Sequence, residues 1–105
     1  MSFREDGHAA VDWAADYLER VLGRAAETGT CVEINAQPNR LDLSDVNARL
    51  AAELGVRIPI STDSHEVAAL GHMPLGVAQA RRAWLTKAQV LNTRTWPQIA
   101  RLLNR

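Results

Sequence analysis

Two short apolar runs, residues 30–35 and 57–61, are the candidate β-strands of this 105-residue sequence, and a helical segment separates them. That segment, residues 45–54, follows Ser44, a favourable helix N-cap, and ends at Gly55. When a helix connects two strands, the strands lie parallel to each other and the connection is a right-handed crossover. The predicted fold class is therefore α/β. Two strands are too few for a complete sheet or barrel. We therefore expect unpaired strand edges and an uncovered apolar sheet face.

The rest of the chain is predicted to be helical after an irregular, polar opening over residues 1–12. Apolar residues recur at helical spacing from Trp13 to Glu27, behind Asp12 as N-cap and before a Thr28-Gly29 stop. Pro59 argues against a central position for the second strand, because proline cannot donate to the ladder. Shorter helices are predicted over residues 66–70, 76–84, 87–92 and 96–103, and we expect the tryptophans to pack helices against the sheet: Trp13, Trp84 and Trp96. No repeat or linker divides the chain, so residues 1–105 are read as one domain.

Charge and cysteine content exclude several classes of protein. The 12 basic residues balance the 12 acidic ones, so bulk charge gives no reason to expect binding to nucleic acid or to anionic membrane. No apolar run has the length of a membrane span, and the opening lacks the pattern of a signal peptide. Cys31 is the single cysteine and cannot form an internal disulfide. These features favour a cytoplasmic protein with no membrane partner.

The charges are nevertheless divided unevenly along the chain. Residues 1–66 hold all twelve acids and six arginines, whereas residues 67–105 hold six basic residues and no acid. Such an asymmetry is typical of a surface for DNA or for an acidic partner. Solvated helix faces are the favoured alternative, because cations near a C-terminus offset the helix dipole and no aromatic residue is interleaved for base stacking.

The sharpest candidate site follows the second strand, where Asp63 and His65 stand two residues apart. In parallel α/β folds the active site lies at the carboxyl ends of the strands. In an extended stretch both side chains point to one side, where a carboxylate and an imidazole can share a divalent metal ion. The alternative is an aspartate that caps the following helix beside a surface histidine. His8 and His72 are expected to be surface imidazoles.

Polar residues on and after the first strand are further candidates. Glu33 and Asn35 share one face of that strand, and if the strands are neighbours Asn35 lies close to Asp63. An acid in a buried strand is costly unless paired or metal-bound, so Glu33 either lines a site, forms a salt bridge or faces water. Arg40, in the loop beyond, has the planar donors that bind phosphate, although an ion pair with Asp42 or Asp45 is an equal alternative.

Several of these segments, taken in order, resemble one known family. Residues 33–43, EINAQPNRLDL, are similar to the E-I-N-x-x-P-x-R-L-D-L segment of PHP (polymerase and histidinol phosphatase) domains, and in particular of those fused to family X DNA polymerases. Residues 60–65, ISTDSH, resemble the final D-x-H metal motif of that family. The GVAQARRAWL of residues 76–85 and the VLNT of residues 90–93 are similar to its closing helix and signature. The resemblance extends over residues 11–105.

This resemblance implies a fold and an activity. PHP domains are distorted (β/α)7 barrels that bind divalent metal ions (zinc, manganese or iron) and hydrolyse phosphoesters, and the polymerase-fused members imply 3′–5′ exonuclease or related processing of DNA ends. Carried over, Asp63 and His65 are the catalytic metal ligands. Glu33 and Asn35 line the site, and Arg40 is placed to bind phosphate. The substrate would be DNA or another phosphoester.

The resemblance also implies that most of the barrel is missing. The early H-x-H and H-P ligands of the family are absent, and 105 residues supply only about two of the strands in a barrel that needs roughly 200 residues. We therefore expect a C-terminal barrel fragment (a truncated, split or degenerate gene product) that has little activity alone, binds metal weakly, and self-associates or pairs with a complementing N-terminal PHP segment. The alternative is a non-catalytic remnant that binds a partner chain or DNA.

Overall fold

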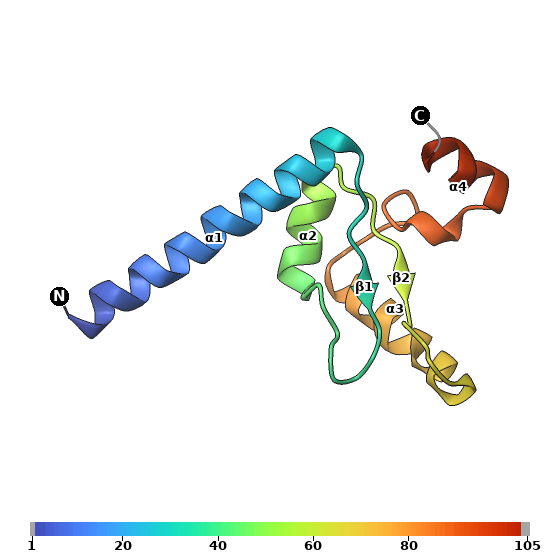
Figure 1. The fold of residues 1–105 in the computed structure, drawn as a ribbon, viewed down its shortest axis with the longest axis horizontal. Helices are drawn as coiled ribbons and strands as arrows, with labels where there is room; N and C mark the ends of the chain where they lie inside the picture. Colours follow the sequence, from blue (N-terminus) through green and yellow to red (C-terminus); the bar gives the residue numbers. More distant parts are fainter. Residues whose placement is uncertain (1, 104–105) are drawn as a thin grey trace.

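The computed structural model describes residues 2–103 and shows a mixed α/β fold with four α-helices and a two-stranded parallel sheet (Figure 1). The α-helices are α1 (Phe3–Thr28), α2 (Asp45–Glu53), α3 (Met73–Arg82) and α4 (Trp96–Leu103). The strands are β1 (Ile34–Asn35) and β2 (Ile60–Ser61), and the 3₁₀ helices are η1 (Val67–His72) and η2 (Leu91–Thr93). None of the described helices combines the length and apolar character needed to cross a membrane.

The two strands pair in parallel, as the sequence predicts, with Ile34 beside Ile60 and Asn35 beside Ser61. A third segment, missed by the sequence analysis, lies on the other side of β2. Val90 forms a parallel bridge with Ile58, whose N–H donates to the Gln89 carbonyl at 2.9 Å. The prediction of a helix over residues 87–92 is therefore wrong. Val90 and Leu91 are buried, and pairing with the sheet prevails over weak local helix propensity.

The side chain of Asn92 continues this third row beyond Val90. Its Oδ1 accepts from the Ile60 N–H at 3.0 Å, and its Nδ2 donates to the Ile60 carbonyl at 2.8 Å. The segment around Pro59 is thus central, contrary to the expectation from the proline. Pro59 is tolerated because it lacks only a donor on the β1 side, where its carbonyl still accepts from the Ile34 N–H at 2.9 Å.

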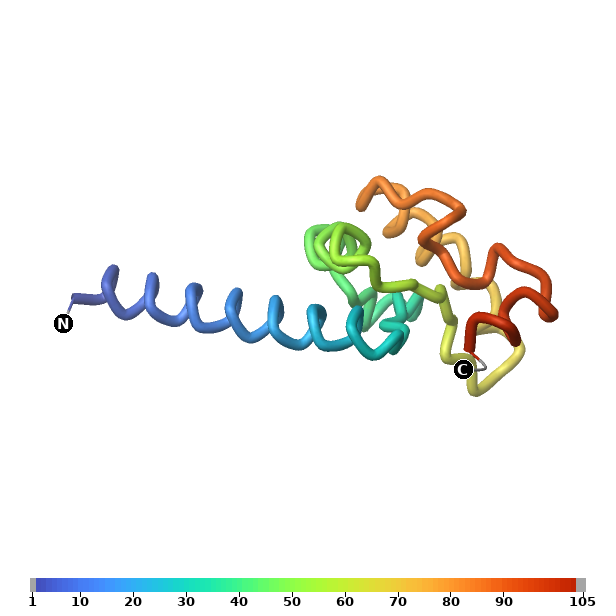
Figure 2. Tube along the Cα trace, turned by 90° about the horizontal axis from the view of Figure 1, so that it is seen from above, coloured from blue at the N-terminus to red at the C-terminus, as the bar shows by residue number. Residues whose placement is uncertain are grey.

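The core lies between the sheet and the helices α2 and α3, which sit on the same side of the strands (Figure 2). Ile34 and Ile58 are fully buried there, against the alanines of α2: Ala48, Ala51 and Ala52. The alternate residues Glu33, Asn35, Pro59 and Ser61 point to the opposite face, and of these only Asn35 is buried. The strands expose no large apolar side chain on that face, which corrects the expectation of an uncovered apolar one.

Helix α1 begins at Phe3, ten residues before the predicted start. The expectation of an irregular opening is therefore wrong for residues 3–12. Met1, which belonged to the same prediction, lies outside the described residues. Ser2 caps the helix, because its hydroxyl oxygen accepts a hydrogen bond from the Glu5 N–H at 3.1 Å. The acidic residues of the first turn interact favourably with the positive end of the helix dipole. Only Leu22 and Ala25 of this helix are buried. Its N-terminal part projects away from the rest of the protein (Figure 1).

The tryptophans are exposed rather than packed against the sheet: 66% for Trp13, 80% for Trp84 and 72% for Trp96. The core beside the strands consists mainly of alanines and β-branched residues instead. Helix α3 starts at Met73, directly after η1, and ends at Arg82, because the backbone of Trp84 turns into the left-handed region at φ 61°. Helix α4 has no buried residue.

Candidate functional site

The candidate site lies where β1 and β2 end. Asn35 is the last residue of β1, and Asp63 follows β2 by two residues. The Asn35 Nδ2 donates to Asp63 Oδ2 at 3.4 Å, so the parallel register brings together the two side chains that the sequence analysis expected to be neighbours. Asn35 is 2% exposed, whereas Asp63 is exposed to solvent. A fixed amide thus holds one oxygen of an accessible carboxylate.

Gln37 joins the two loops, and the sequence analysis missed it. Its Nε2 donates to the Asp63 carbonyl at 2.7 Å, and its backbone N–H donates to Asn35 Oδ1 at 3.0 Å. Asn35 therefore uses both ends of its amide within the site. The only sequence signal for Gln37 is its position two residues beyond a strand that ends in a polar side chain.

The backbone turns sharply at Asp63, with φ at 50°, so the stretch from Asp63 to His65 is not extended as predicted. Aspartate tolerates this left-handed conformation better than most residues, and the Ser61 hydroxyl accepts from the Asp63 N–H at 3.0 Å. Non-glycine residues with a left-handed backbone conformation are strained, and such residues occur often at functional sites.

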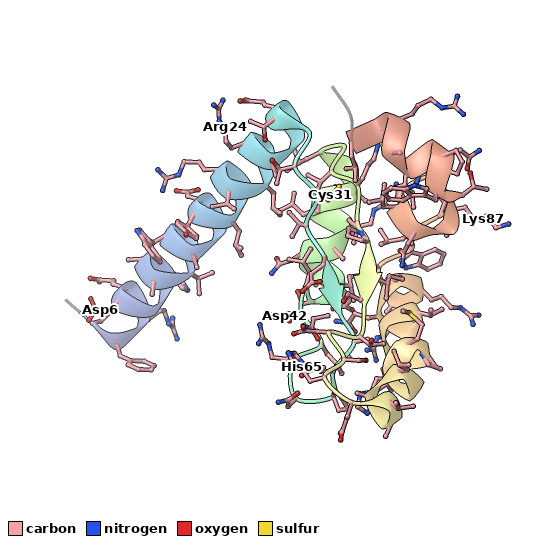
Figure 3. All side chains as sticks on the ribbon, turned by 45° about the vertical axis from the view of Figure 1, so that its right-hand side comes forward. Asp6, Arg24, Cys31, Asp42, His65 and Lys87 are labelled. Carbon is pink, nitrogen blue, oxygen red and sulfur yellow. The ribbon has the colours of Figure 1, made fainter. Side chains whose placement is uncertain are left out.

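The turn directs the His65 ring back to the chain, and its Nδ1 lies 2.8 Å from the Asp63 carbonyl oxygen. A carbonyl only accepts, so Nδ1 carries the proton in this contact and Nε2 keeps its lone pair. Histidines that bind metal ions commonly donate their second ring nitrogen in this way, which fixes the tautomer and the ring. Figure 3 shows His65 at the end of the sheet where the strands terminate.

These contacts leave one carboxylate oxygen of Asp63 and Nε2 of His65 without a hydrogen-bond partner among the described residues. A catalytic zinc site usually has three protein ligands. Within residues 2–103, however, no group of three or more histidine, cysteine, aspartate or glutamate side chains is arranged to hold a metal ion.

The other predicted residues lie outside this contact network. Glu33 is exposed and forms no salt bridge with any described residue, which favours the alternative that it faces water. Arg40 lies in the loop after β1, and its Nε is 3.9 Å from Asp42 Oδ1. Both side chains are more than half exposed, so this weak ion pair leaves the guanidinium accessible.

His72 is half-buried, which corrects the prediction of a surface imidazole. It lines a hollow of about 340 Å³ together with His65, Glu66 and the loop residues from Gln37 to Asn39. Its Nδ1 is buried without a hydrogen-bond partner among the described residues. His8, in contrast, is exposed on α1, as expected.

The sequence is similar to that of one curated protein, DNA polymerase/3'-5' exonuclease PolX of Bacillus subtilis (strain 168). The two are 36% identical over 88 residues, which are 84% of this chain but only 15% of that protein. No family model matches the chain. The similarity shows that this chain is related to one segment of a DNA polymerase/3'-5' exonuclease.

Proposed function

We propose that this chain is the C-terminal part of a PHP-type phosphoesterase domain that processes DNA 3′ ends. The similarity to PolX carries this proposal, because that relative is a DNA polymerase/3'-5' exonuclease. The contact between Asn35 and Asp63 at the carboxyl ends of two parallel strands supports it, since α/β enzymes bind their ligands there.

In this proposal Asp63 and His65 hold a divalent ion (zinc, manganese or iron) through the free carboxylate oxygen and Nε2. Asn35 and Gln37 keep that pair in place, the first through the Asp63 carboxylate and the second through the Asp63 carbonyl. Arg40 binds the phosphate, with Glu33 at the margin of the site. When bound, the ion would supply Lewis-acid activation of water toward the phosphodiester.

The remaining ligands come from a second polypeptide segment in this proposal, because two protein ligands bind a metal ion weakly. The chain alone is expected to show little turnover. A segment carrying the early histidines of a PHP domain would complete both the barrel and the site.

The test compares the chain alone with the chain mixed with a separately produced N-terminal PHP segment of the PolX relative. Bound manganese is measured by elemental analysis after gel filtration, and hydrolysis is followed on a 3′-labelled DNA oligonucleotide. We expect metal binding and cleavage in the mixture, and Asp63→Ala or His65→Ala to abolish both. Asp16→Ala and His8→Ala, which change exposed residues of α1, are the matched controls. Equal loss in the controls, or no metal bound in either sample, would show that the proposal is wrong.

A second candidate function is non-catalytic binding of DNA or of an acidic partner. Exposed Trp96 and Arg101 line a hollow of about 400 Å³ on α4, which gives a stacking surface beside a cation. Binding of single-stranded DNA that is lost in Trp96→Ala but unchanged in Asp63→Ala would favour this function over the catalytic one.

A further inference from the structure

Helix α1 carries an apolar seam that the protein itself leaves uncovered. Its members follow alternating intervals of four and three residues: Phe3, Gly7, Ala10, Ala14, Tyr17 and Val21. This interval keeps side chains on one side of a helix and is typical of the contact line between two packed helices. All six residues are exposed, including Phe3 at 95%. The seam lies beside the buried pair Leu22 and Ala25, which already contacts the body of the protein.

The seam ends in a hollow at the C-terminal part of the helix. Tyr17, Val21 and Ala25 of α1 form one wall, and Thr30 and Val32, just before β1, form the other. Its volume is about 550 Å³ and its lining is mainly apolar. A phenylalanine side chain fits such a space, and Phe3 is the most exposed large apolar residue of the described chain.

Charges along one flank of the seam are arranged by sign. Asp6 lies near the N-terminal end of α1 and Arg24 near the other end, as Figure 3 shows. They are 18 residues apart, about five helical turns, so they lie on the same flank. Arg20 is one turn from Arg24 on this flank. An identical helix that runs in the opposite direction would set acid against base here.

We propose that the seam of α1 binds the α1 seam of a second copy of this chain in antiparallel orientation. The two-fold axis passes at Ala14, so that Gly7 meets Val21 of the second copy and Phe3 enters the hollow beside its Ala25. Asp6 then lies between Arg20 and Arg24 of the second copy, because a two-fold axis across the helices brings like flanks together. The stacked rings of Trp13 and Tyr17, 5.6 Å apart, flank the centre of the interface.

The area available is sufficient for a small specific dimer. The exposed side chains of the seam, two of them aromatic, offer on the order of 600 Å² in each copy, so about 1,200 Å² is buried in total, the lower end of specific interfaces. We therefore look for a weak dimer that dissociates in the micromolar range.

The first test measures the mass of the full chain by light scattering at about 1 to 100 µM, the range in which such a dimer would dissociate. We expect the wild type to approach twice 11.6 kDa at the high end. Ala14→Glu places two carboxylates together on the axis and should raise the dissociation constant at least about a hundredfold. His8→Glu, which adds a carboxylate on the far side of the exposed helix, should leave the dimer unchanged.

Circular dichroism of both variants verifies that the helix content is retained. A wild type that stays monomeric, or an Ala14→Glu variant that still dimerises, would overturn the proposal.

The second test fixes the orientation of the helices, in a Cys31→Ser background. Ala14→Cys should form a disulfide between copies under mild oxidation. Gly7→Cys should not, because the two cysteines would lie about 21 Å apart along antiparallel helices. Cross-linking at both positions would indicate parallel helices and refute the model. Asp6→Arg should weaken the dimer about tenfold, and Arg20→Asp with Arg24→Asp in the same chain should restore it.

Discussion

Gly76 is the position where a single methyl group should damage this fold most specifically. It lies in α3 at the point where the helix touches both strands. A Cβ added there would be 2.6 Å from Ile60 Cγ2 and 2.9 Å from Ala36 Cβ. Ordinary carbon contacts are about 3.5–4.0 Å, so Gly76→Ala requires α3 to move away from the sheet by about an ångström.

The magnitude follows from two opposing terms. Overpacking of this kind costs about 1–3 kcal/mol, because Ile60 is β-branched and Ala36 has no rotamer to change. The gain in helix propensity from glycine to alanine is at most about 1 kcal/mol. Because both contacts are shorter than 3.0 Å, the upper part of the overpacking range applies, about 2–3 kcal/mol, so after the propensity gain we expect Gly76→Ala to lower the free energy of unfolding by about 1–2 kcal/mol.

Gly23→Ala is the matched control, since an added Cβ in that turn of α1 meets nothing within 4 Å. There the propensity term acts alone and should raise the free energy of unfolding by about 0.5–1 kcal/mol. Urea denaturation followed by circular dichroism, at one protein concentration, measures both variants. If Gly76→Ala proves as stable as the wild type, the close packing of α3 on the strands is refuted.

Three further changes test contacts that hold the fold together away from the candidate site. Asn92→Ala removes both hydrogen bonds to Ile60 and should cost about 2 kcal/mol in the same urea assay, whereas Asn39→Ala in an exposed loop should cost nothing measurable. Ser44→Ala removes the oxygen that accepts from the Asn47 N–H at 3.2 Å, and thermal denaturation should show a loss of about 1 kcal/mol. Leu22→Ala empties the contact between α1 and the core, and we expect a loss of about 2–5 kcal/mol; a loss below about 1 kcal/mol would show that α1 is not anchored there.

The sequence predicted the centre of the fold better than its margins. Helix α2 and the parallel pairing of the strands followed from Ser44, Gly55 and the apolar runs, because local caps and tertiary packing favour the same structure there. Val90 was predicted as helical because its role depends on a partner 32 residues away, which no local pattern reveals. The start of α1 was missed because polar residues 3–12 form a helix without any covered face.

In the candidate site, proximity was predictable and orientation was not. Asn35 and Asp63 meet because parallel strands end at the same edge, a consequence of topology alone. The left-handed backbone at Asp63 and the return of the His65 ring to its carbonyl depend on loop geometry that residue spacing cannot specify. Gln37 and His72 lie on loops and a 3₁₀ helix, where no periodicity constrains which side chain points inward.

The side-chain amide of Asn92 has a consequence for how this sheet can grow. Because it occupies both the N–H and the carbonyl of Ile60, no incoming strand can hydrogen-bond to that residue from the same side. On the outer side of β1, the Asn35 N–H is already taken by the Asp42 carbonyl. Both borders are thus closed near the ends of the strands, and edge-to-edge aggregation is blocked there. A polypeptide that extends the sheet must therefore add along residues 31–33 and reach Asp63 with a loop.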